Sequence, residues 1–115
     1  MPAYNFKSQF ASAVVSGRKR QTIRAKRKTP PKAGQTAHLF TGMRTRNCRR
    51  LGTYLIRATH DIEITEGGVK IDDVDLYESQ LNDFAQRDGF DCWEYMRDWF
   101  KRVHGLPFRG DLIRW

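Results

Sequence analysis

The segment Ile62-Glu63-Ile64-Thr65-Glu66-Gly67-Gly68-Val69-Lys70-Ile71 marks a change in the character of the chain. Apolar residues alternate with polar ones on both sides of its Glu-Gly-Gly turn, and this pattern predicts a β-hairpin. The sequence before the hairpin favours strands, whereas the sequence after it favours helices. Because strands and helices are largely separated along the chain, we expect an α+β fold.

The part before the hairpin predicts one short helix among extended segments. Apolar residues recur at helical spacing over residues 7–16, and Gly17 stands where a helix commonly ends. The segment 26–34 is basic and contains Pro30-Pro31, so it predicts a loop. Strands are expected at residues 4–6, 21–25, 36–40 and 51–56.

Two helices and a final strand are expected after the hairpin. Asp75 with Glu78, and Asp91 with Glu94, match the pattern in which a side-chain oxygen caps the first turn of a helix. The final strand is expected at residues 112–115. Residues expected to face the core are Leu81, Phe84 and Ala85 in the first helix, and Trp93, Met96, Phe100 and Val103 in the second, which ends at Gly105.

The size and cysteine content of the chain limit its organisation. A length of 115 residues is enough for one domain and short for two separate cores, so we expect a single domain over residues 1–115. Cys48 and Cys92 form no CxxC pair, and we expect no metal and no other cofactor. Two cysteines without a disulfide framework favour the cytoplasm, and the short apolar runs predict no contact with a membrane. The three histidines are expected to be structural: His38, His60 and His104.

Charge is divided unevenly between the two halves of the chain. Residues 1–60 hold 14 of the 21 Lys and Arg and no acid, whereas residues 61–115 hold 7 bases and all 13 acids. Part of the basic half can pair with the acidic half across the fold. A net charge of +8 nevertheless remains, and Lys and Arg in excess attract phosphate. We therefore expect a surface that faces a polyanion, and assign Arg44 and Arg46 in the turn 42–50 to phosphate contact.

The segment Ser16-Gly17-Arg18-Lys19-Arg20-Gln21-Thr22-Ile23-Arg24 carries four bases and, after Gly17, the hydroxyl of Thr22, directly after the first helix. It fits a phosphate- or nucleotide-handling loop and a solvated basic turn equally well. Lys19 and Thr22 also form a minimal catalytic pair, because a lysine kept neutral by burial or by neighbouring cations can accept a proton from a hydroxyl or a water.

At this segment the chain resembles the ASCH domain family. The resemblance extends from Phe10 through the segment 16–24, Pro31-Lys32-Ala33-Gly34-Gln35 and Leu51-Gly52. It continues in Ala85-x-x-Asp88-Gly89-Phe90 and in the ending Pro107-Phe108-Arg109-Gly110-Asp111-Leu112-Ile113-Arg114-Trp115. It implies a small, partly closed PUA-like β-barrel with flanking α-helices. It also implies that RNA or a nucleotide binds in a cleft lined by the segment 17–24.

One branch of that family is similar to small amidohydrolases that remove the acyl group from N4-acetylcytidine and related N4-acylated cytosines with a Lys, a Thr and a Glu. Lys19 and Thr22 match the first two, and Asp88, shorter by one methylene, stands where the branch has Glu. The resemblance implies that Thr22 is the nucleophile and Lys19 its base. Asp88 would orient the cytosine N4 or return a proton to it, while Arg18 and Arg24 would contact the substrate.

Two other functions remain open from the sequence. The charge excess favours an RNA- or nucleotide-binding module without catalysis, because a free nucleoside carries no phosphate. A ribonuclease is the third possibility, since some family members resemble RNA-degrading proteins. In each case the expected partner is a cytidine-type nucleoside or RNA, and the expected oligomeric state is a monomer or a weak dimer.

Overall fold

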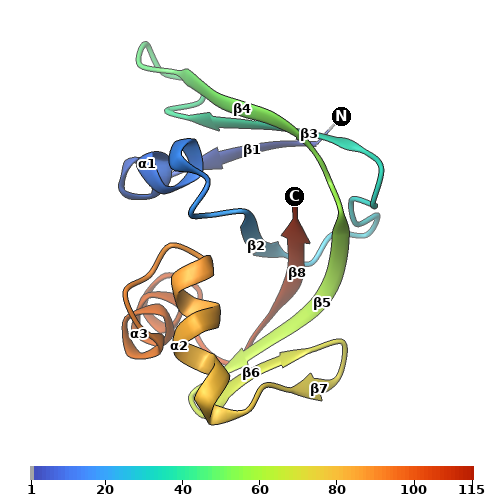
Figure 1. Cartoon of the computed structure of the whole chain (residues 1–115), viewed down its shortest axis with the longest axis vertical. Helices are drawn as coiled ribbons and strands as arrows, with labels where there is room; N and C mark the ends of the chain where they lie inside the picture. Colours follow the sequence, from blue (N-terminus) through green and yellow to red (C-terminus); the bar gives the residue numbers. More distant parts are fainter. Residues whose placement is uncertain (1) are drawn as a thin grey trace.

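The computed structural model describes residues 2–115 and contains two β-sheets and three helices (Figure 1). The first sheet has the order β1-β3-β4, with β1 (Ala3–Phe6) parallel to β3 (Thr36–Thr41) and β4 (Arg49–Leu55) antiparallel to β3. The second has the order β2-β8-β5-β6-β7 and is antiparallel throughout. Its strands are β2 (Gln21–Ala25), β5 (Ala58–Thr65), β6 (Gly68–Ile71), β7 (Val74–Asp75) and β8 (Phe108–Arg114). The α+β prediction is confirmed, and neither sheet closes on itself within residues 2–115.

The helices lie at different places on the two sheets. α1 (Ser8–Ser16) follows β1 and packs near the first sheet, whereas α2 (Glu78–Arg87) and α3 (Trp93–Val103) lie beside the second (Figure 1). Gly17 ends α1 in the left-handed conformation, with φ of 82°, as the sequence predicted. No helix in the described part of the chain is long and apolar enough to cross a membrane.

The predicted hairpin is confirmed, with Thr65 opposite Gly68 and Ile62 opposite Ile71. The predicted helix caps are wrong. Asp75 belongs to β7, and α2 is preceded by Tyr77, whose amide donates to the Gln80 side chain. Cys92 precedes α3 without a side-chain cap. The last strand is longer than predicted, because pairing with β5 extends it back to Phe108.

Two clusters of apolar side chains form the core. One fills the space between the second sheet and helices α2 and α3, and the other lies between α1, the first sheet and the end of β8. The expected core residues of α2 are buried, as are Trp93, Met96 and Phe100 in α3. Val103 was expected in the core but is 40% exposed, because it lies in the last turn of α3 at the edge of a pocket.

Gly110 allows β2 and β8 to approach closely. A Cβ atom at this position would overlap the main-chain oxygen of Arg24 and lie 2.9 Å from Cε1 of Phe108. We expect Gly110→Ala to lower the free energy of unfolding by about 1–3 kcal/mol, since the backbone must shift. Urea denaturation measures this, with Gly67→Ala as control because its nearest neighbour would be 3.9 Å away. Equal stability of the two variants would contradict the prediction.

Candidate active site

The segment after α1 contains both buried and exposed polar side chains. Lys19, Gln21 and Thr22 are each only 3% exposed, whereas Arg18 and Arg20 are exposed. The amide of Lys19 donates to the carbonyl of Ala13, 2.9 Å away, and this bond fixes the chain as it leaves the helix. A single basic segment therefore supplies both buried polar groups and surface charge.

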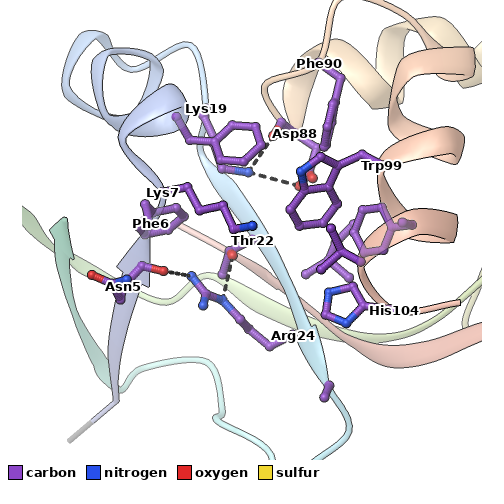
Figure 2. A pocket seen from close by; sticks show the side chains of 15 residues that line it. Asn5, Phe6, Lys7, Lys19, Thr22, Arg24, Asp88, Phe90, Trp99 and His104 are labelled. Atoms are coloured by element: carbon purple, nitrogen blue, oxygen red, sulfur yellow. Dashed lines mark hydrogen bonds and ion pairs between the residues drawn. The ribbon is translucent and has the colours of Figure 1, made fainter. Parts of the chain in front are cut away.

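Lys19 and Thr22 line a pocket with a volume of about 220 Å³ between the α1 side and the α3 side of the molecule (Figure 2). The walls are largely aromatic. Phe10 contacts Phe90 and Trp99 edge-on, with ring centroids 5.3 and 6.0 Å apart. Aromatic walls of this kind exclude water and offer flat faces on which a planar group can stack.

Lys19 and Asp88 meet in the lining of this pocket (Figure 2). Its Nζ lies 2.5 Å from the main-chain oxygen of Asp88 and 3.3 Å from Oδ1. Gln21 Nε2 donates to the same Oδ1 over 3.1 Å. Both members of the pair are almost fully buried, so two groups 69 positions apart in sequence form one polar unit inside an aromatic pocket.

Burial moves the two pKa values of this pair toward each other. It lowers the pKa of Lys19 below the usual lysine range, although the neighbouring Asp88 carboxylate acts in the opposite direction. Burial also raises the pKa of Asp88, against the effects of Lys19 and the Gln21 hydrogen bond. Passing a proton from the Lys19 ammonium to the Asp88 carboxylate therefore costs less than it would between exposed side chains, although the two groups lie at ion-pair distance. Lys19 is thus suited to accept a proton and Asp88 to supply one.

Thr22 is held by Arg24 rather than by Lys19. Arg24 Nε donates to Thr22 Oγ1 over 2.9 Å, and its Nη2 donates to the main-chain oxygen of Asn5, also over 2.9 Å. Its guanidinium also lies 5.0 Å from the ring centroid of Phe6. Because Arg24 donates to the hydroxyl oxygen, the hydroxyl hydrogen of Thr22 is directed elsewhere.

The structure brings some of the predicted site residues together and separates others. The three predicted catalytic residues Lys19, Thr22 and Asp88 line one pocket with Arg24. Arg18 does not line this pocket but a second hollow, which is described below. Arg44 and Arg46 are exposed in the turn between β3 and β4 and do not line the pocket.

Sequence reasoning missed the opposite wall of the pocket. Trp99 lines it from α3, His104 from the residue that follows this helix, and Phe90 from the connection between α2 and α3 (Figure 2). The position of Trp99 could have been found in part from the sequence. It follows the core residue Met96 by three positions and therefore lies beside the apolar face of the helix. His104 was expected at a helix end and caps α3, but its place in the pocket depends on how that helix packs.

Comparisons of the chain with protein-family models, with curated proteins and with solved structures gave no match. Within residues 2–115, no three His, Cys, Asp or Glu side chains lie close enough together to hold a metal ion.

Proposed function

We propose that the protein hydrolyses the amide bond of N4-acylated cytosine nucleosides such as N4-acetylcytidine. The observation that carries this proposal is the convergence of the buried residues Lys19, Asp88 and Thr22 in the lining of one pocket with aromatic walls. The resemblance to the ASCH amidohydrolase branch supports the same assignment, because it rests on the residues that meet there.

The proposed reaction begins when Thr22 Oγ1 attacks the acyl carbonyl carbon. Neutral Lys19 accepts the hydroxyl proton, directly or through one water, and Arg24 stabilises the negative oxygen of the tetrahedral intermediate. The carbon–nitrogen bond then breaks, and protonated Asp88 transfers its proton to the departing N4 amine. Lys19 then passes the proton it accepted to Asp88, its hydrogen-bonded neighbour, so that the amine is neutral again and the carboxyl is protonated. Water attacks the acyl-threonine ester while Lys19 accepts a proton from it, and Lys19 returns this proton to the departing Thr22 oxygen, which releases the carboxylic acid and restores the hydroxyl.

The dimensions of the pocket support a substrate of nucleobase size. Its volume of about 220 Å³ is below the roughly 300–1,000 Å³ typical of sites for drug-sized ligands. We propose that the acylated cytosine enters between the aromatic walls while the ribose stays outside. Stacking on Phe90 or Trp99 would orient the ring, since every base has a flat π face.

The direct test is the release of cytidine and acetate from N4-acetylcytidine by the purified protein. Both products should form in equal amounts and at a rate that hardly changes with salt, because the substrate is uncharged. A folded protein that releases neither product from this nucleoside or from longer N4-acyl analogues would overturn the proposal.

The rate of this reaction is expected to rise with pH through the pKa of Lys19, since only the neutral amine can act as a base. Burial lowers that pKa, so the rise should be complete well below the value of about 10.4 for an exposed lysine. Measurement of kcat/KM from about pH 5 to pH 10 gives the profile. Lys19→Arg should abolish the rising limb, because guanidinium stays protonated. A rate that still rises near the exposed-lysine value would contradict this assignment.

The charge distribution favours a second function, binding of RNA without catalysis. Residues 1–60 carry 14 bases and no acid, which exceeds what a neutral nucleoside needs. Binding of this kind would weaken steeply as salt is raised, in contrast to nucleoside hydrolysis.

We also propose that the two sheets form the partly closed PUA-like barrel that the resemblance implies. Ile56 supports this arrangement, because it joins β4 to β5 and thus one sheet to the other. Its amide donates to Gln35 and its carbonyl accepts from Gly34, each over 2.9 Å. The adjoining Arg57 amide donates to the carbonyl of Arg114 in β8.

A further inference from the structure

Five arginines surround a second hollow, here called the arginine hollow, with a volume of about 220 Å³. Gln21 is the remaining lining residue, and its side chain is bonded to Asp88. The five come from separate parts of the fold: Arg18 and Arg20 from the turn before β2, Arg57 from the β4–β5 connection, Arg87 from the last turn of α2, and Arg114 from β8.

The strand register holds three of these arginines next to one another. The amide of Arg57 donates to the carbonyl of Arg114 over 2.8 Å, and the amide of Trp115 donates to the carbonyl of Arg20 over 3.1 Å. Arg114 itself is paired with Gln21 of β2 on one side and with Ala58 of β5 on the other. Backbone pairing therefore fixes the main-chain positions from which these three side chains extend.

The charge of the arginine hollow is poorly balanced by the protein. Arg87 pairs with Asp83, with Nε and Oδ2 3.0 Å apart, and this is the only ion pair that the described residues form with the five arginines. Arg57 Nε donates to the main-chain oxygen of Trp115 over 3.1 Å. Arg18 Nε donates to the hydroxyl of Ser16 over 3.3 Å. Burial and the charges of Arg87 and Arg57 lower the pKa of Arg114, as expected where cations crowd together.

We propose that the arginine hollow binds ligands carrying two or more neighbouring phosphate groups, either consecutive phosphates of a polynucleotide or the phosphate chain of a nucleoside triphosphate. Guanidinium forks match phosphate oxygens in pairs, and several forks around one hollow can engage more than one phosphate. The lining contains no aromatic side chain, so the site recognises phosphate rather than a base. This proposal does not depend on the hydrolase activity, because binding is measured without the reaction.

The test compares two double variants with the same net charge. Arg20→Gln with Arg57→Gln removes two guanidinium groups from the arginine hollow, whereas Lys28→Gln with Arg102→Gln removes two exposed charges that do not line it. Binding of a fluorescent oligouridylate is followed by anisotropy, and binding of inorganic triphosphate by calorimetry. Thermal unfolding confirms that both variants are folded.

The expected loss follows from counterion release. At 0.1 M salt each phosphate contact to a single strand contributes about fivefold to affinity, so loss of two contacts should weaken oligouridylate binding about 25-fold and flatten its salt dependence. The control pair should change the affinity less than about threefold. Loss confined to oligouridylate identifies a polynucleotide site, and loss confined to triphosphate identifies a nucleotide site. Equal weakening by the two double variants, or binding of neither ligand by the original protein, would overturn the proposal.

Discussion

Thr22→Val is expected to reduce kcat for N4-acetylcytidine hydrolysis about a thousandfold or more while leaving the fold intact. Valine has nearly the shape of threonine and suits the strand in which Thr22 lies, but it lacks the oxygen that is the proposed nucleophile. The measurement is steady-state hydrolysis, with circular dichroism to confirm folding.

Two matched variants make this experiment specific. Thr22→Ser keeps a hydroxyl and should retain activity within about tenfold of the original. Thr53→Val makes the same chemical change at an exposed position in β4 and should leave the rate unchanged. If Thr22→Val kept more than about a tenth of the activity, Thr22 would not be the nucleophile, and a water activated by Lys19 would take its place.

Lys19→Met is expected to abolish hydrolysis and to lower the free energy of unfolding by about 3–5 kcal/mol at neutral pH. Methionine fills the space of the lysine stem but leaves Asp88 buried without its cationic partner. The pKa of Asp88 is already raised by burial and should rise further in this variant. Stability is therefore lost as pH increases from the pKa of the unfolded aspartate toward that of the folded one. Urea denaturation at several pH values measures this dependence.

A double variant separates the lost charge balance from the lost packing. Lys19→Met with Asp88→Asn removes both ionisable groups and keeps an oxygen that can accept from Gln21. It should recover most of the stability and lose the pH dependence, yet remain inactive. A double variant as unstable as Lys19→Met alone would show that packing around the lysine stem, rather than the buried charge, accounts for the loss.

Local patterns in the sequence predicted the secondary structure well. The alternation at Ile62 and Ile64, the breaking residue Gly17 and the Pro30-Pro31 loop each act within a few residues, and the structure agrees with all three. The predicted cap of α2 was wrong because the residue before the helix is Tyr77, not an aspartate. The amide of Tyr77 donates to the side chain of Gln80, and the Asp-based pattern does not describe this arrangement. The two-residue strand β7 is too short to leave a periodic signal.

Only part of the candidate site could be predicted from the sequence. The sequence suggested Lys19 and Thr22 as a pair three positions apart, but it could not show that they line one pocket. Asp88 could be included only through the family resemblance, because its meeting with Lys19 depends on long-range packing. Trp99 and His104 line the pocket only because of the way in which α3 packs on the rest of the fold, and a local sequence pattern does not predict this packing.

The bond between Lys19 and Asp88 also has a consequence for the order in which the protein matures. It joins positions 69 residues apart, so it closes a long loop and requires most of the chain to be in place. Until then Lys19 is hydrated, positively charged and a poor base. On the proposed function, the amine of the nascent chain is therefore unreactive, and it becomes a base only after the segment around Asp88 has docked against Lys19.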